Sequence, residues 1–399
     1  MTIVDRWLLP DGVDELLPEA AWRVEQLRRE LLDLFRVWGY QLVMPSLVEY
    51  TESLFIGLGT DIEVHSFKVV DEVSGRLMAI RPDITPQVAR IDAHSLSSDG
   101  FSRLCYADSV LHTRPKSLLA SRSPIQLGAE FYGEAGVAAD IEILCLMLET
   151  LKTAGLASIC LDLGHVGIFK ALARAGGVDK SGEADLFDAL QRKAAGEIEA
   201  IAAGVAADPS LAPLLVALSR LHGDASILGE ARSVLAQAPP EVLAAIAHLE
   251  QVATEVQRRH PAVQCFFDLA ELRGYHYHTG LVFAAYTPGH GQAVANGGRY
   301  DDIGKVFGRC RPATGFSTEL KTLASLAQPP RQAVIGSIFA PYSDDLNLWE
   351  IVQHLRRSGE VVVFGRSDQP LPETCDRELL WAGDEWRLQP LERSRERQR

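Results

Sequence analysis

Cysteine is scarce in this sequence, and long hydrophobic runs are missing. The chain of 399 residues has six cysteines, scattered along its length without a CxxC pair. This pattern predicts neither a zinc ribbon nor a disulfide framework, and reduced thiols of a cytoplasmic protein are the simplest expectation. No segment reaches about 18 uncharged apolar residues, so no membrane span is predicted. The first residues also lack the apolar core of a signal peptide.

Positive charge is in deficit. The sequence has 39 Lys and Arg residues against 53 Asp and Glu residues, a formal net charge of −14. A protein that binds tRNA or DNA normally presents a basic surface to the phosphates, so the composition disfavours a nucleic-acid partner. The apolar content of 47% and the charged content of 23% are ordinary for a globular chain. The length suits about two or three domains.

Common catalytic and cofactor motifs are absent too. The sequence has no nucleophile elbow, Walker loop, HExxH motif or dinucleotide fingerprint, and we expect no cofactor. A metal site through His276 and His278, with His290 as a third ligand, deserves consideration because alternate strand positions can supply such ligands. No carboxylate or cysteine completes a recognisable ligand pattern, so we expect no metal.

Hydrophobic periodicity separates helical from extended segments. Pro18 begins a helical pattern, and Gly39 follows it in a C-cap position. A second helix is expected to begin with Thr85 as its N-cap and Pro86 in its first position. A hairpin is expected to turn at Ser74–Gly75.

A change of composition near residue 166 divides the sequence further. From there to about residue 258 the chain is rich in Ala and Leu, helical in period and nearly free of aromatic residues. Strand patterns then return, and a Pro pair at 329–330 marks a linker before one β-α-β unit. The predicted parts are a core of residues 1–165 and 259–328, a helical insertion at 166–258, a small C-terminal unit at 329–390 and a tail at 391–399.

Two polar clusters lie at a helix start and along a strand. In RPDITPQ, Asp83 and Thr85 lie at the mouth of the predicted helix, where Asp83 would pair with a cation such as an α-ammonium group; helix capping is the alternative. In QLGAEFYG, Gln126 and Glu130 point to the same face of a strand. Gly128 between them would let a small ligand lie against the backbone. An edge strand with one wet face is the alternative.

Two further clusters lie nearer the C-terminus. In RGYHYHTG, interpreted as a strand, Arg273, Tyr275 and Tyr277 share one face and His278 lies on the other. The arginine could bind a carboxylate, and Tyr or His could hydrogen-bond an imidazole. The glycines of NGGRYDDIG permit close backbone approach, or simply form a hairpin loop. The residues alone therefore predict an α/β protein, with an amino-acid pocket only if the clusters meet in space.

Together the clusters resemble the catalytic core of histidyl-tRNA synthetases, which are class II enzymes, over roughly residues 8 to 325. GY…MPS…E around Pro45 is similar to motif 1, the dimer-forming element, RPDIT to the RPEGT loop, and QLGAEFYG to the end of motif 2. RGYHYHTGLVF is similar to the histidine-recognition loop RGLDYYTGTVFE, and GGRYDDIG and PATGFSTEL follow as GGRYDGL and motif 3 do. The resemblance implies an α+β fold: an antiparallel sheet flanked by helices, with a helical insertion and a small C-terminal β-α-β unit.

The resemblance also implies a role for each residue. Asp83 stands where the family has glutamate, and His278 where it has tyrosine. Transferred position by position, Asp83, Thr85 and Gln126 would bind the amino end of a histidine ligand, Glu130 would face its imidazole, Arg273 its carboxylate, and Tyr277 and His278 would line the ring.

The ATP half of the family's site is not preserved. Active class II enzymes carry FRxE in motif 2, where this sequence has Leu111 at the arginine and Thr113 at the glutamate. Thr322 replaces the arginine that ends motif 3, although Arg114 could slide partly into the motif 2 gap. Losing one such positioned cation typically costs about 10²–10³ in rate. We therefore predict no catalytic residue and negligible adenylation.

This combination resembles ATP phosphoribosyltransferase regulatory subunits, a family of synthetase paralogues to whose loop RPDITPQVAR is similar. The resemblance implies a non-catalytic subunit that activates the short-form catalytic subunit in the first step of histidine biosynthesis and mediates feedback inhibition by L-histidine. It also implies a homodimer through the synthetase-like core, within a hetero-octamer, and no tRNA or membrane partner. The alternatives are an active histidyl-tRNA synthetase and a stand-alone histidine-binding protein.

Overall fold

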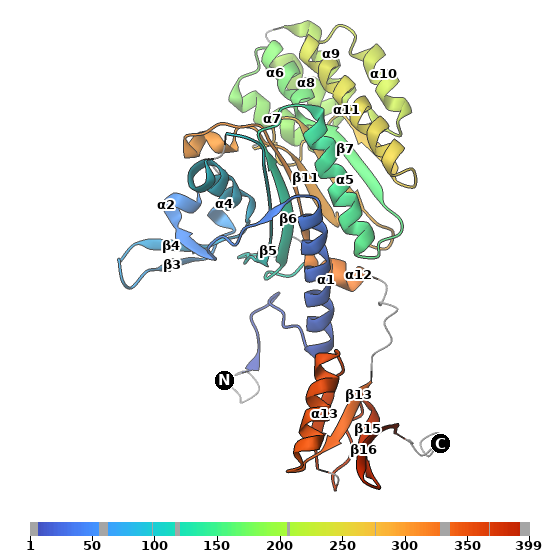
Figure 1. The fold of residues 1–399 in the computed structure, drawn as a ribbon. Helices are drawn as coiled ribbons and strands as arrows, with labels where there is room; N and C mark the ends of the chain where they lie inside the picture. The colour runs from blue at the N-terminus through green and yellow to red at the C-terminus, as the bar shows by residue number, and fades with distance from the viewer. Residues whose placement is uncertain are drawn as a thin grey trace. The chain divides into compact units, whose positions relative to one another are not determined.

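The chain forms two compact units, residues 1–328 and 329–399, and each is described by itself. Among the described residues, none of the helices combines the length and the hydrophobicity that a membrane span requires. The computed structural model (Figure 1) describes residues 7–55, 63–97, 99–115, 120–205, 208–275, 277–327, 336–366 and 368–391.

A large sheet forms the centre of the first unit (Figure 1). Neighbouring strands are antiparallel, except that β1 is parallel to β5 and β7 is parallel to β9. The predicted α+β architecture with an antiparallel core sheet is confirmed. The order across the sheet is β1 (Gln41–Leu42), β5 (Ser102–Ser109), β6 (Ile125–Tyr132), β12 (Ala313–Glu319), β11 (Ala295–Arg299), β10 (Leu281–Tyr286), β7 (Cys160–His165), β9 (Gln264–Asp268) and β8 (His222–Gly223).

The two faces of this sheet have different partners, because side chains alternate along each strand. On one face, Cys105, Leu127 and Ala129 belong to the main hydrophobic core. The helices α1 (Pro18–Val37) and α5 (Val137–Thr153) contribute their buried side chains to the same core. The opposite face is therefore left for polar residues and for the site.

Helix α1 forms where the periodicity predicts it. It begins at Pro18, buries Leu31 and Phe35 one turn apart, and is followed by Gly39, whose φ of +86° suits glycine. The ring of Phe35 meets that of Phe316 on β12 edge-on, with 6.0 Å between the centroids. This contact fixes the helix on the core face of the sheet.

Helix α4 (Thr85–Arg90) begins at the residue that the sequence predicts as its cap. The backbone N–H of Thr85 donates to Oδ1 of Asp83 at 3.0 Å, and no side chain caps the helix. The expected N-cap role of Thr85 is therefore wrong, because Asp83 makes the local turn instead. The chain continues as a π-helix (Ile91–Leu96), and a second core joins α4 to Tyr106 of β5.

The long segment after β7 is helical, as its composition predicts. Its buried apolar side chains join the same core as those of β7 and β10, and β8 pairs with β9, so the segment is built onto the sheet. Its separation as a domain at 166–258 stays a prediction. The helices described here are α6 (Val166–Ala175), α7 (Lys180–Gln191), α8 (Ala195–Val205), η3 (Pro209–Leu211), α9 (Ala212–Leu218), α10 (Ser226–Val234) and α11 (Pro240–Arg259).

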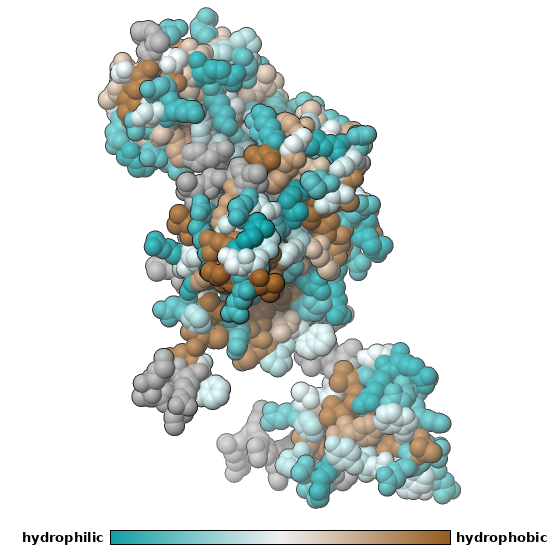
Figure 2. Space-filling model, turned by 90° about the vertical axis from the view of Figure 1, so that its left-hand side faces the viewer, coloured by the Kyte–Doolittle hydropathy of each residue, from teal (hydrophilic) through white to brown (hydrophobic). Residues whose placement is uncertain are grey.

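A smaller sheet near the N-terminus carries exposed apolar side chains. Its hairpin turns at Gly75, whose φ is +70°, in agreement with the prediction, and Val70 is 64% exposed. Figure 2 looks onto this side of the molecule, and brown apolar side chains gather there. The strands lie in the order β2 (Val48–Tyr50), β4 (Leu77–Ile80) and β3 (Lys68–Val70), and the short elements of the unit are α2 (Thr51–Leu54), η4 (Ile303–Phe307) and α12 (Leu320–Leu326).

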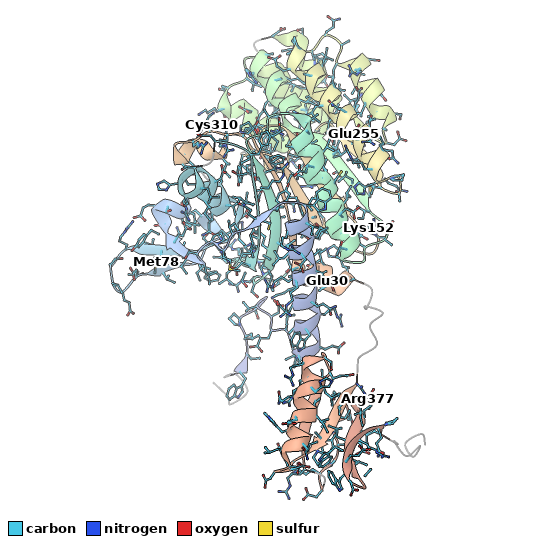
Figure 3. The ribbon with its side chains drawn as sticks, in the orientation of Figure 1. Glu30, Met78, Lys152, Glu255, Cys310 and Arg377 are labelled. Atoms are coloured by element: carbon cyan, nitrogen blue, oxygen red, sulfur yellow. The ribbon has the colours of Figure 1, made fainter. Side chains whose placement is uncertain are left out.

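The second unit contains the predicted β-α-β unit and an additional hairpin. The hairpin was missed because charged residues interrupt both of its strands. Arg377, labelled in Figure 3, lies in the first of these strands and donates to Glu360 at 2.7 and 3.0 Å. Of the predicted tail, residues after 391 lie outside the described part. The elements are β13 (Ser337–Pro341), α13 (Leu346–Arg357), β14 (Val362–Gly365), β15 (Cys375–Ala382) and β16 (Glu385–Pro390), with the sheet order β14-β13-β15-β16.

Asp345 joins α13 to this hairpin. Its carboxylate caps the helix by accepting from the Asn347 N–H at 2.9 Å, and it accepts from the Trp386 indole at 2.7 Å. We expect Asp345→Ala to lower the unfolding free energy of this unit by about 2 kcal/mol, because a cap and a side-chain hydrogen bond are both lost. Hydrogen exchange of the α13 amides would measure the loss. Asp368→Ala, which removes an exposed ion pair with Arg366, is the control and should leave the exchange of these amides unchanged, because exposed ion pairs contribute little to stability.

Candidate functional site

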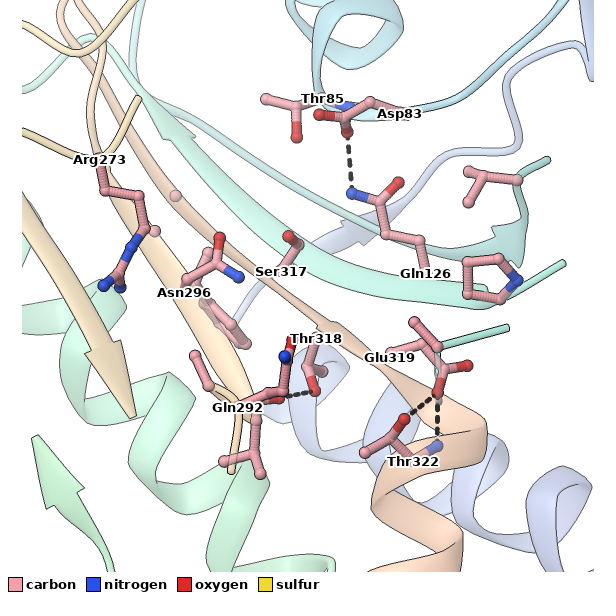
Figure 4. A pocket seen from close by; sticks show the side chains of 18 of the residues that line it. Asp83, Thr85, Gln126, Arg273, Gln292, Asn296, Ser317, Thr318, Glu319 and Thr322 are labelled. Carbon is pink, nitrogen blue, oxygen red and sulfur yellow. Dashed lines mark hydrogen bonds between the residues drawn. The ribbon is translucent and has the colours of Figure 1, made fainter. Parts of the chain in front are cut away.

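A pocket of about 1160 Å³ lies on the polar face of the large sheet (Figure 4). Residues directly opposite each other on two strands share a face, so Gln126 lies beside Glu319, and Glu130 beside Gly315. Small-molecule pockets typically have about 300–1,000 Å³, so one amino acid would fill only part of this one. All seven residues predicted to bind histidine line the pocket: Asp83, Thr85, Gln126, Glu130, Arg273, Tyr277 and His278.

Asp83 and Gln126 form one corner of the pocket (Figure 4). The Gln126 amide donates to Oδ1 of Asp83 at 2.8 Å, and its oxygen accepts from the Ile84 N–H at 2.9 Å. Within the described residues, Oδ2 of Asp83 accepts no hydrogen bond, so one carboxylate oxygen is available for a ligand. This corner can bind a small cation, with Thr85 beside it.

Glu130 is the most deeply buried acid of the pocket, with 1% of its surface exposed. It accepts hydrogen bonds from the hydroxyls of Tyr106, at 3.0 Å, and of Tyr300. Burial raises the pKa of Glu130 to about 8, while the two tyrosine hydroxyls act in the opposite direction and the nearby Asp83 raises it further. In the ligand-free protein Glu130 is therefore mostly a neutral acid at pH 7, able to donate a hydrogen bond.

The glycines of the pocket floor make room for side chains. A Cβ at Gly128 would overlap the Tyr106 hydroxyl, and a Cβ at Gly315 would overlap the Glu130 carboxylate. The expectation that Gly128 lets a ligand lie against the backbone is therefore wrong, because the phenol of Tyr106 occupies that space. Substitution at Gly128 would displace the Tyr106 hydroxyl that donates to Glu130, and substitution at Gly315 would displace the acid itself.

The segment Leu269–Gly280, which we call the recognition loop, is a turn and not the strand predicted from its alternation. Gly274 has a φ of +64°, and its carbonyl accepts from the N–H groups of Tyr277 and His278 at 2.9 and 2.8 Å. The tight turn breaks the two-residue period, so Tyr277 and His278 both line the pocket and Tyr275 leaves it. His276 lies outside the described residues.

His278 is a buried, neutral ring. Its Nδ1 lies 2.9 Å from the Arg273 carbonyl, to which it donates, and burial lowers its pKa to about 4. The ring packs 4.1 Å from that of Tyr277. The described part of the chain contains no group of three or more His, Cys, Asp or Glu side chains arranged to bind a metal. The arrangement suits an aromatic ligand.

Arg273 enters the pocket from a different side than Asp83 (Figure 4). Its Nη2 lies 3.1 Å from the carboxylate of Glu271 and 3.1 Å from the hydroxyl of Tyr286, and 38% of the side chain is exposed. Among the described lining residues it is the sole Lys or Arg. The pocket thus offers a carboxylate and a guanidinium to the two ends of an amino acid.

Apart from Arg273, the described residues that line the pocket include no positioned cation for phosphates. Thr322, which lines it, donates its N–H to Glu319 at 2.5 Å and bonds the same carboxylate through its hydroxyl. Leu111 is partly buried and Arg114 is exposed outside the lining. Leu111 and Thr322 therefore stand at two positions where the family has arginine, and Arg114 does not compensate for the loss.

Several residues in or next to the pocket were missed by the sequence interpretation. Tyr106 and Tyr300 bind Glu130, while Asn296 and Ser317 lie opposite each other on β11 and β12. Alternation along PATGFSTEL could have placed Ser317 and Glu319 on one face. Register with β11 could not have been predicted, because residues 300–312, which include η4, connect the two strands in place of a short hairpin turn.

Two family models together match most of the chain. Residues 12–323 match the model described as histidyl-tRNA synthetase. Residues 335–389 match the model described as ATP phosphoribosyltransferase subunit HisZ C-terminal domain. The second match covers the small unit that follows the synthetase-like core.

Three relatives that match along their whole length share one name. The chain is 53% identical over 395 residues to the ATP phosphoribosyltransferase regulatory subunit of Stutzerimonas stutzeri, covering 98% of this chain and 100% of the relative. The proteins of that name from Azotobacter vinelandii and Pseudomonas aeruginosa are 52% and 51% identical, with the same coverage.

Solved structures have the same fold. An ATP phosphoribosyltransferase regulatory subunit/histidyl-tRNA synthetase from Bacillus halodurans C superposes with a TM-score of 0.78 at 25% identity, covering 92% of this chain and 94% of that one. Histidyl-tRNA synthetase from Nostoc sp. PCC 7120 gives a TM-score of 0.77 at 16% identity, covering 96% and 94%. This second likeness concerns the fold alone.

Proposed function

Because the chain belongs to the family of ATP phosphoribosyltransferase regulatory subunits, we propose that its pocket binds L-histidine and that this binding controls a catalytic partner. A regulatory subunit of this kind is itself non-catalytic, so it acts by changing the activity of the subunit that it binds. Our proposal has two parts. This chain activates the short-form catalytic subunit in the first step of histidine biosynthesis, and histidine reverses that activation.

The observation that carries the proposal is the joint presence of Asp83 and Arg273 in one pocket with a buried acid. The free oxygen of Asp83 suits an α-ammonium group, and the guanidinium of Arg273 suits an α-carboxylate. The acid of Glu130 can donate to a ring nitrogen, and Tyr277 and His278 supply flat surfaces for the ring. Thr85 and Gln126 complete the amino-end corner.

Loss of the phosphate-binding cations supports regulation over aminoacylation. With Leu111 and Thr322 at the two arginine positions, an ATP triphosphate would meet no guanidinium in the described ATP half of the pocket. Positioned cations supply most of the stabilisation in phosphoryl and adenylyl transfer. The amino-acid half of the site is retained, so the pocket can still bind an amino acid without activating it.

Feedback requires that histidine bind the active and inhibited states of the complex unequally. A coupling free energy of about 1–3 kcal/mol, or roughly 5- to 150-fold in affinity, is typical of such regulation. The pocket therefore need not contact the partner's active site. It needs only to differ between the two states.

We propose the assembly that the resemblance implies: a homodimer through the core, within a hetero-octamer with the catalytic subunit in the cytoplasm. Apolar side chains around the motif 1 segment support the homodimer, since Leu42, Met44 and Leu47 are 46%, 76% and 47% exposed and β1 is an edge strand. Sedimentation of the chain alone and with its partner would test both steps.

The test is a phosphoribosyl-transfer assay with the short catalytic subunit of the same organism. We expect higher activity when this chain is added, and a return toward the basal rate when L-histidine is also present. Histidine-dependent ATP–pyrophosphate exchange by this chain alone should stay at background, because the phosphate-binding cations are missing.

Each other result has a definite meaning. Activation without inhibition would move the histidine site to the catalytic subunit. No activation, with tight histidine binding by the isolated chain, would favour a stand-alone histidine-binding protein. Exchange above background would restore the synthetase alternative.

A further inference from the structure

The recognition loop is anchored from outside the pocket by the first two helices of the helical segment. The N–H of Val166, at the start of α6, donates to the Gly280 carbonyl at 3.0 Å. One turn later the Lys170 ammonium donates to the His278 carbonyl at 2.6 Å. Because residues four apart lie on the same side of a helix, one side of α6 binds two points of the loop.

Tyr275 provides a second anchor, on α6 and α7. Its ring lies between those of Phe169 and Phe187, with centroid distances of 5.4 and 5.3 Å, and its hydroxyl donates to the Glu183 carboxylate. The side chain is buried, with 7% exposed. The ammonium of Lys170 also lies 4.8 Å from the centre of the Tyr275 ring.

These contacts bracket the residues that line the pocket. Tyr275 lies two residues after Arg273 and two before Tyr277, so its anchoring fixes the turn from which both side chains extend. The carbonyl bound by Lys170 belongs to His278 itself. Lys170 is half-buried, and its ammonium needs a hydrogen-bond partner there, which the loop carbonyl supplies.

We propose that Lys170, Glu183 and Tyr275 are positioning residues that order the recognition loop and thereby set the affinity of the pocket for histidine. The part of this inference that concerns affinity rests on the proposed function. The helical segment then acts on the pocket directly, through α6 and α7, and is more than a covering of the sheet.

Lys170→Met is the variant that tests this, because it keeps most of the aliphatic stem and removes the donor. We expect calorimetric titration to show about tenfold weaker histidine binding, since a hydrogen bond from a charged group is lost. Tyr275→Phe, which removes the hydroxyl that donates to Glu183, should weaken binding by about threefold. Lys170→Arg retains a donor and should restore most of the affinity.

Loop order is measured separately by hydrogen exchange of the Tyr277, His278 and Thr279 amides in the ligand-free proteins. We expect faster exchange in Lys170→Met. Arg232→Gln is the control, because it breaks an α10–α11 ion pair with Glu250 in the same segment away from the loop, and its exchange and affinity should match wild type.

The outcomes separate the two proposals. Absence of histidine binding by wild type would overturn the histidine site, while the exchange data would still decide whether the loop is anchored by Lys170. Unchanged exchange and affinity in Lys170→Met would overturn the positioning role. An affinity loss shared with Arg232→Gln, or not restored by Lys170→Arg, would also overturn it by indicating general destabilisation.

Discussion

Replacing Asp83 with asparagine is expected to weaken histidine binding by about a hundredfold, because truncating one partner of a buried, hydrogen-bonded charge pair typically costs about 2–5 kcal/mol. Asparagine can still accept from Gln126 and from the Thr85 N–H, as Oδ1 of Asp83 does. The corner of the pocket should therefore keep its shape. Only the charge presented by Oδ2 to an ammonium group is lost.

The ligand supplies the matched control for this prediction. Imidazole propionate lacks the α-amino group, so it should bind wild type weakly and be nearly indifferent to Asp83→Asn. The four titration values form a double-mutant cycle in which one partner is the ligand's ammonium group. Equal losses for histidine and for imidazole propionate would place the ammonium elsewhere and contradict the assigned orientation.

The polar face of the site could be predicted from local alternation. Gln126 and Glu130 are two steps of a period-two pattern, and the strand keeps that pattern because both of its neighbours pair with it in register. What lies across from them could not be predicted. Gly315 opposes Glu130 only because β12 returns beside β6 after more than 180 residues, and no local pattern specifies such a pairing.

The recognition loop shows where alternation misleads. Its residue types alternate as they do in a strand. However, Gly274 adopts a positive φ, and its carbonyl accepts hydrogen bonds from two N–H groups within the loop. The turn satisfies the backbone locally and needs no neighbouring strand. Its residues were nevertheless assigned to the pocket, because the order of motifs resembles a known family even where the predicted conformation was wrong.

The C-terminal hairpin was harder to predict than the core fold. The core fold followed from motifs spread over the first unit, whereas the C-terminal hairpin has no such motif. In its two strands Arg377 pairs with Pro390 and Glu378 with Gln389. These residues give neither face of the hairpin an apolar pattern. The hairpin is stabilised by pairing with β13 and by Trp386 bonding to Asp345, which are tertiary contacts that the sequence does not display.

Glu130→Gln is expected to remove a large pH dependence of stability. The pKa of Glu130 is raised to about 8 in the folded protein, against about 4.3 in an unfolded chain. The folded state therefore retains a proton that the unfolded state loses, and stability falls as the pH rises through this window. Between pH 5 and pH 8 this single group should lower the unfolding free energy of ligand-free wild type by about 3.5 kcal/mol.

Glutamine carries no titrating proton, so the variant should lack this decrease. Thermal unfolding at pH 5 and pH 8 measures the difference, with Glu19→Gln as the control because the Glu19 side chain is 91% exposed. An equal pH dependence in wild type and Glu130→Gln would show that Glu130 is already ionised in the folded protein.

Glu130→Gln should also bind histidine about tenfold more weakly, because an amide cannot exchange a proton with the imidazole. The variant should still assemble with the catalytic subunit. Glu130 thus makes the empty pocket less stable as the pH rises toward 8, and a histidine ring that hydrogen-bonds this acid would relieve the loss.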